Sequence, residues 1–159
     1  MSKRDAFYDS LVFDGYNLSL PADETERKQK ARDLFGALMV ASVDVLIEGA
    51  RKIVAEQNEF AGFTPEQKEK VIALISHNAY GILYWQYVKL DRFNGASLEM
   101  YAVEHNDAEE PQRSTLIVGP SEEELHHSYF EWAEQFGDHY DEDSSTRFSL
   151  GLNANSGEN

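Results

Sequence analysis

The sequence predicts a mainly helical α+β fold, with a long antiparallel helix pair, a β-hairpin and an acidic C-terminal helix. Three observations support this fold class. Apolar residues recur at helical spacing in two long segments, residues 23–60 and 64–93. Two shorter stretches between residues 97 and 118 read as strands, the first through alternation of apolar and polar side chains. A third segment with helical spacing and many carboxylates follows from residue 121.

The first long helix is expected to begin near Asp23, where Glu26 can complete a capping box, and to end near Phe60. A short helix over residues 3–13 and an extended connection are expected before it. Apolar and small side chains at helical spacing form its predicted inward face. This face comprises Phe35, Leu38, Met39, Ser42, Leu46, Gly49, Ala50 and Ile53.

The second long helix is expected from Thr64 to Phe93 and should lie at the centre of the domain. Thr64 suits its cap, Pro65 its first turn, and Gln67 the closing of a capping box. Only a short link separates the two helices, so they are expected to be antiparallel. Two apolar stripes share Ile82; one adds Ile72, Ile75, Ala79, Gln86 and Leu90, and the other adds Val71, Leu74, Asn78 and Trp85. The line expected to face outward is Lys70, His77, Tyr84 and Asp91.

A β-hairpin is predicted from residues 97–105 and 114–118, joined by the acidic loop 106–112. A third helix should then begin at Ser121, which has the spacing to Glu124 of a capping box. Residues 1–140 are therefore expected to form a single compact domain, and residues 141–159 a loose polar tail. The third helix is expected to pack on the helix pair through an aromatic stripe, which consists of Leu125, Tyr129, Trp132, Phe136 and Tyr140.

The chain is strongly acidic, and the acidity is concentrated in its C-terminal part. Its 159 residues include 14 Lys and Arg against 29 Asp and Glu, so the formal net charge is −15 at pH 7. Residues 1–92 hold 12 basic and 14 acidic side chains, whereas residues 93–159 hold 2 and 15. Phosphate contacts need cationic side chains, so this balance argues against direct binding of nucleic acid or of anionic membranes. It is compatible with a basic protein surface as the partner, with metal cations, or with a role in solubility alone.

Composition also bounds the chemistry and the location. The chain has no cysteine, which excludes disulfides, thiol nucleophiles and thiolate metal ligands. Residues 71–88 carry no charged side chain, but they are too rich in Ser, His, Asn, Tyr and Gln for a membrane span. Acidic residues interrupt the first 15 positions, so no secretory signal is expected and the predicted location is the cytoplasm.

The main functional hypothesis concerns an acidic surface on the third helix. From residue 121 to residue 143 the sequence holds nine carboxylates and no lysine or arginine. We expect a small acidic interaction protein that binds a basic partner, with inhibition in the manner of an immunity protein or a nucleic-acid mimic as one form of this function. The competing interpretation is a solvated face whose glutamates favour the helix dipole. The predicted binding residues are Glu122, Glu123, Glu131, Glu134, Asp138 and Asp141.

Two other functions stay open from the sequence. His77, Tyr80 and Tyr84 form a polar group in an apolar helix and would suit the pocket of an enzyme or ligand-binding protein. The competing interpretation, which the lack of a recognisable partner favours, is a core or boundary histidine with satisfied hydrogen bonds. No catalytic motif accompanies these residues, so no residue is assigned a catalytic role. The other function is an oligomeric or structural subunit that associates through the aromatic stripe and the hairpin edge.

Metal binding is suggested by two Glu-x-x-His spacings, Glu123 with His126 and Glu124 with His127. Di-iron helical bundles use this spacing on two helices, together with carboxylates from two others. Here it occurs on one helix only, and the expected inward stripe is aromatic. We therefore expect no resident metal or cofactor, with these four residues as the nearest approach to a metal site.

Overall fold

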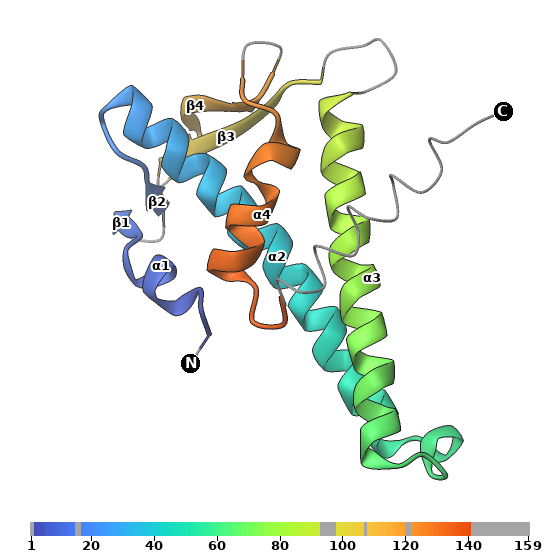
Figure 1. Ribbon diagram of the computed structural model, residues 1–159. Helices are drawn as coiled ribbons and strands as arrows, with labels where there is room; N and C mark the ends of the chain where they lie inside the picture. The colour runs from blue at the N-terminus through green and yellow to red at the C-terminus, as the bar shows by residue number, and fades with distance from the viewer. Residues whose placement is uncertain (1, 15–16, 93–97, 107, 120–121, 141–159) are drawn as a thin grey trace, which may run out of the picture.

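The computed structural model describes residues 2–14, 17–92, 98–106, 108–119 and 122–140. It confirms the predicted fold class, since two long helices dominate a mixed α+β fold (Figure 1). The predicted tail, residues 141–159, lies outside the described residues. Each helix in the described ranges is too short or too polar to cross a lipid bilayer. In chain order the elements are α1 (Asp5–Asp9), β1 (Val12–Asp14), β2 (Asn17–Ser19), α2 (Glu24–Glu56), η1 (Asn58–Phe60), α3 (Pro65–Asp91), β3 (Met100–His105), β4 (Pro111–Val118) and α4 (Leu125–Phe136).

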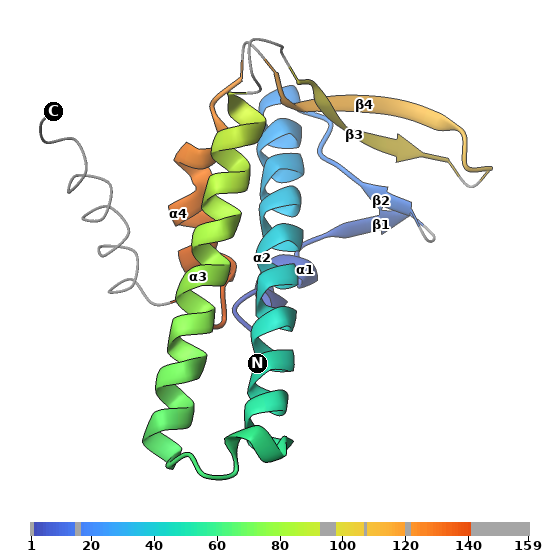
Figure 2. The ribbon, with the colours of Figure 1, turned by 90° about the vertical axis from the view of Figure 1, so that its right-hand side faces the viewer.

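The antiparallel pair consists of α2 and α3, which lie side by side (Figure 2). Local capping determines where both helices begin. The Asp23 side chain accepts hydrogen bonds from the backbone N–H groups of Thr25 and Glu26, both at 3.0 Å. At the start of α3, Thr64 and Gln67 form the expected capping box, with distances of 3.2 and 2.8 Å. Both predicted helix starts are therefore confirmed.

The predicted inward face of α2 is wrong in part. Leu38, Leu46 and Ile53 are 54%, 56% and 48% exposed, whereas Val40 and Ile47 are fully buried. Apolar side chains occur around most of the circumference of α2, so their spacing alone does not select one face. Contact with α3 and α4 selects it instead, and the buried residues are Ala31, Arg32, Gly36, Ala37, Val40, Asp44, Ile47 and Val54.

The same correction applies to α3. Ile82, which both predicted stripes share, is 60% exposed, whereas its neighbour Leu83 is 2% exposed. The helix is thus open on one side instead of being covered on most sides. Asp91 was expected to face outward, but its side chain is only 3% exposed. It is drawn inward because it accepts hydrogen bonds from backbone N–H groups at the start of α4, 2.8 Å from Leu125 and 2.9 Å from His126.

The start of α4 also differs from the prediction. The helix starts at Leu125, later than predicted, and Glu124 occupies its N-cap position without a side-chain capping bond. Ser121 itself lies outside the described residues. Asp91 of α3 therefore supplies the cap that the local sequence does not, and it joins the end of α3 to the start of α4.

The aromatic stripe of α4 packs on the helix pair as predicted. Tyr129, Trp132 and Phe136 are at most 3% exposed. Gly36 of α2 provides the space for Trp132, because a Cβ atom at that position would overlap the indole ring. A single buried apolar cluster joins residues from the three long helices, from β4 and from the segment after β2.

Two antiparallel hairpins complete the described structure. The predicted pairing of β3 with β4 is confirmed, although β4 begins at Pro111, earlier than expected. The β1–β2 hairpin was not predicted, because three residues in each strand are too few to show an alternating pattern. Glu104 and Arg113 of the β3–β4 hairpin form hydrogen bonds with the segment that follows the β1–β2 hairpin. Glu104 Oε1 accepts the N–H of Leu20 at 2.9 Å, and Arg113 Nη2 donates to the Leu20 carbonyl at 2.9 Å.

Candidate functional site

Part of the predicted acidic surface is ion-paired within the molecule. Glu122 lies 2.5 Å from Lys28 Nζ of α2, and only 7% of its side chain is exposed. Asp138 accepts hydrogen bonds from the Lys3 backbone N–H at 2.7 Å and from Arg4 Nη2 at 3.2 Å. Burial raises the pKa of Asp138, but the Lys3 hydrogen bond and the Arg4 charge lower it overall, below the ordinary aspartate value. These two carboxylates therefore already have cationic partners.

The rest of the predicted surface consists of exposed glutamates. Glu123, Glu131 and Glu134 are exposed and form no ion pair within the described ranges. Asp141 lies outside those ranges. In place of an uninterrupted row of carboxylates, the structure thus shows three exposed glutamates beside two neutralised acids.

Of the predicted pocket residues His77, Tyr80 and Tyr84, the two tyrosines contact different groups, and His77 is half-buried. The Tyr80 hydroxyl donates to Asp44 Oδ1 at 2.6 Å, and burial, with that hydrogen bond, raises the pKa of Tyr80 above its ordinary value. The Tyr84 ring packs against the ring of Tyr129, with centroids 5.4 Å apart. The cavities described below are lined by other side chains. Tyr80 and Tyr84 therefore contribute to packing between helices.

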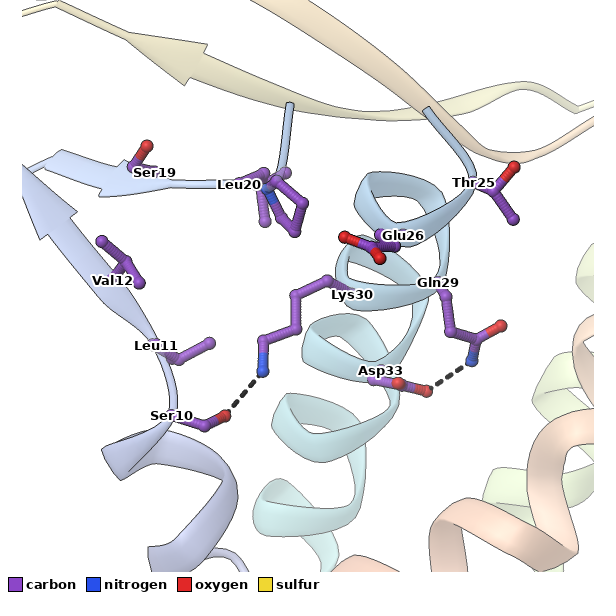
Figure 3. Close-up of a pocket in the computed structure, with 11 residues that line it drawn as sticks. Ser10, Leu11, Val12, Ser19, Leu20, Thr25, Glu26, Gln29, Lys30 and Asp33 are labelled. Carbon is purple, nitrogen blue, oxygen red and sulfur yellow. Dashed lines mark hydrogen bonds between the residues drawn. The ribbon is translucent and has the colours of Figure 1, made fainter. Parts of the chain in front are cut away.

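One hollow of about 700 Å³ lies between the first hairpin and the start of α2 (Figure 3). Several of the polar groups that line it bind one another. Lys30 Nζ donates to Ser10 Oγ at 2.6 Å and lies 4.6 Å from the Phe7 ring centroid. Gln29 Nε2 donates to Asp33 Oδ1 at 2.9 Å. The Lys30 contacts fasten the N-terminal segment to α2, whereas the Gln29–Asp33 bond lies within α2.

A second hollow, of about 520 Å³, is a groove between α2 and α3. Its edges include Leu46, Leu74 and Ile82, which are 56%, 63% and 60% exposed. No lining residue is charged, and most are apolar. The lining residues are Met39, Ser42, Val43, Leu46, Leu74, Ile75, Asn78, Ala79, Ile82, Leu83 and Gln86. We call this surface the α2–α3 groove.

The α2–α3 groove lies on a side of the helix pair that α4 does not cover. On α3, Tyr84 and Tyr87 contact aromatic rings of α4, whereas Leu74, Asn78 and Ile82 line the groove. At about 100° per residue these two sets fall on different faces of α3. The sequence did contain a signal for the groove, because the two apolar stripes of α3 present more apolar surface than one neighbouring helix can bury.

A cluster of possible metal ligands lies at the start of α4. Glu124, His126 and His127 place one ligand atom each within 4.8 Å of one another. Of the four residues that the sequence singled out, the structure brings these three together and leaves out Glu123. The difference follows from the helix start: Glu124 occupies the N-cap position with extended backbone, so its carboxylate reaches the side chains of the first turn.

No protein-family model, curated protein or solved structure matches the chain.

Proposed function

We propose that the protein is an interaction protein that self-associates through the α2–α3 groove, with a second copy of the chain as the occupant. The observation that supports this function is the exposed, charge-free apolar face along the two longest helices. Large exposed apolar patches on folded proteins are typical of interaction sites. Burying the exposed parts of Leu46, Leu74 and Ile82 would stabilise a complex by about 1 kcal/mol each.

The distribution of charge favours a second copy as the occupant. Residues 24–56 hold six basic and six acidic side chains, and residues 65–91 hold three of each, so the helix pair has a balance of zero. The acidic excess belongs to residues 93–159. Two copies that meet through their helix pairs would therefore bring neutral surfaces together, and α4 of each copy would remain on the side away from the contact.

The geometry also suits a two-fold contact. An isologous interface uses the same patch on both subunits, and an antiparallel helix pair can pack on its own copy as a four-helix layer. Ser42 and Ala79 are small residues in the groove lining, so the helices of a second copy could approach closely there.

Light scattering on the purified chain tests this function. We expect the mass of a dimer for the wild-type protein, and the mass of a monomer for the double variant Leu46→Glu, Ile82→Glu, because both side chains are exposed at the groove. Ala73→Glu is the matched control. Ala73 is exposed. It lies seven residues, about two helical turns, before Tyr80 and therefore shares the face of Tyr80, which does not line the groove. A wild-type monomer, or a double variant that stays dimeric, would refute the proposal.

A basic protein partner is the second candidate, and the exposed Glu123, Glu131 and Glu134 favour it. We expect a partner captured at low salt to dissociate as salt is raised, because exposed charges are screened. Changing these three residues to lysine should abolish the capture. The control variant carries the same change at three exposed glutamates of other elements, Glu24, Glu56 and Glu59. Equal loss in both variants would show a nonspecific effect of net charge and would exclude this surface.

A further inference from the structure

We propose that Glu124, His126 and His127 bind a divalent transition metal ion of the zinc type at the start of α4. Glu124 Oε2 lies 3.4 Å from His126 Nε2 and 3.6 Å from His127 Nε2. The three residues lie within four positions, 124–127, at a helix start, and their side chains converge. This site is independent of the α2–α3 groove, since it uses none of the residues that line it.

The two distances from Glu124 match a zinc site. Zinc binds histidine nitrogen and carboxylate oxygen at about 2.0–2.2 Å with tetrahedral geometry, so two ligand atoms of one ion lie about 3.3–3.6 Å apart. Both measured separations fall in this range. His127 is free to adjust its ring, because 57% of its side chain is exposed.

Asp91 supplies the carboxylate that commonly orients a metal-binding histidine. Its Oδ2 lies 2.8 Å from His126 Nδ1. The same carboxylate accepts the N–H groups of Leu125 and His126, and its side chain is 3% exposed, so its position is fixed. A carboxylate only accepts hydrogen bonds, which means that Nδ1 carries the proton in this contact. The arrangement is the carboxylate–histidine–metal relay found around zinc ions.

The relay leaves His126 Nε2 facing another acceptor. With Nδ1 bonded to Asp91, Nε2 is the ring nitrogen left to bind a metal ion, and Glu124 Oε2 lies 3.4 Å from it. An ion between these two atoms would have one nitrogen and one oxygen ligand. A metal ion satisfies both atoms and His127 at once, whereas a proton on Nε2 would satisfy only the Glu124–His126 pair. This difference makes His127 the residue that distinguishes the two cases.

The ligand set favours zinc and its neighbours over calcium and magnesium. Two imidazoles and one carboxylate suit Zn²⁺, Co²⁺, Ni²⁺ or Cu²⁺, while Ca²⁺ and Mg²⁺ prefer oxygen ligands. Arg92 is the one cation within ion-pair reach of Glu124 in the described part of the chain, with Nη2 3.9 Å from Oε2. Its side chain is 66% exposed, so it can move away at little cost. Three protein ligands leave a fourth position for water or a further ligand.

Titration calorimetry of the full chain with Zn²⁺ tests the site. We expect one ion per chain and a higher unfolding temperature with Zn²⁺. His127→Ala should weaken binding by more than about tenfold, because it removes a direct ligand and even outer partners contribute about 10–100-fold. Asp91→Asn should weaken binding by about 10–100-fold through loss of the orienting carboxylate. His105→Ala, at an exposed histidine of β3, is the control and should bind as the wild type does.

His127→Ala is the decisive variant, because His127 is exposed and the substitution leaves the Asp91 cap of α4 intact. A wild-type chain that does not bind Zn²⁺ would overturn the proposal. So would a His127→Ala chain that binds with wild-type affinity, since the ion would then be held elsewhere. With Co²⁺ as the probe, an absorption band of a tetrahedral site in the wild type, lost in His127→Ala, is the expected result.

Discussion

Tyr80 donates its hydroxyl group to Asp44 Oδ1 at 2.6 Å, and this bond joins α3 to α2 inside the protein. Asp44 also pairs with Arg4 Nη1 and accepts the backbone N–H groups of Asp138 at 2.9 Å and His139 at 3.3 Å. One carboxylate of α2 thus binds the N-terminal segment, α3 and the segment after α4. A buried charge costs several kcal/mol unless it is paired, and these four donors offset that cost.

We predict that Asp44→Ala destabilises the protein by about 3–5 kcal/mol, because it removes the acceptor of four donors and one of the two carboxylates that pair with Arg4. Tyr80→Phe removes one donor and keeps the other three, so we expect a smaller loss of about 1–2 kcal/mol. Urea unfolding followed by circular dichroism measures both free energies. A loss in Tyr80→Phe as large as that in Asp44→Ala would show that Asp44 does not organise these contacts.

Leu83 and Ile82 provide a test of the corrected face of α3. Leu83→Asp should destabilise the fold by several kcal/mol, on the order of the total stability, because it buries a carboxylate without a partner. Ile82→Asp should change the stability of the monomer by less than about 1 kcal/mol, since surface substitutions usually have small effects. Urea unfolding at low protein concentration compares the two. Equal destabilisation would mean that Ile82 is buried in the monomer.

The starts of the long helices were predictable because the signals for them are local. Asp23 and the pair Thr64 and Gln67 lie within three residues of the N–H groups that they bind. The buried faces were not predictable, because Leu46 and Ile47 are both apolar and only the position of a neighbouring helix decides which is covered. For the same reason the sequence showed apolar stripes on α3 without revealing that Ile82 is exposed.

The candidate sites were predictable only where their residues lie close together in the chain. The Glu124 and His127 spacing was visible, but the role of Asp91, which lies 35 residues before His126, was not. Two acidic residues of the predicted surface, Glu122 and Asp138, find cations from the N-terminal part of the chain. Contacts between distant segments therefore changed the functional interpretation more than they changed the fold.

Gly36 and Gly49 of α2 are expected to respond to alanine in opposite directions. A Cβ atom at Gly36 would overlap the Trp132 ring, whereas one at Gly49 would meet nothing within 4 Å. Gly36→Ala should therefore destabilise the protein by about 1–3 kcal/mol through overpacking. Gly49→Ala should stabilise it by about 0.5–1 kcal/mol, because alanine loses less conformational entropy in a helix. Thermal unfolding of both variants checks this pair, and a stabilised Gly36→Ala would mean that α4 does not pack there.

Glu104 should make stability depend on pH in the acidic range. It binds Arg113 through Nε at 2.5 Å and Nη2 at 2.7 Å, and it accepts the N–H of Leu20. The Arg113 hydrogen bonds are the main cause of the shift; partial burial opposes them, and the Leu20 bond adds to them. Together they hold the pKa of Glu104 below the ordinary glutamate value. The unfolded chain therefore takes up a proton at a higher pH than the folded protein does.

The stabilisation from Glu104 is fully present above the unfolded pKa of about 4.3 and is lost as the pH falls through the lower pKa of the folded protein. Urea unfolding free energies measured at a series of pH values across this interval should thus decrease with decreasing pH. Glu104→Gln removes the titrating group and should make this decrease smaller. Glu131→Gln makes the same chemical change at an exposed residue with no ion pair in the described ranges and is the control. A decrease as steep in Glu104→Gln as in the wild type would contradict this prediction. The acid sensitivity would then arise from other carboxylates, and the pKa of Glu104 would be the same in the folded and the unfolded chain.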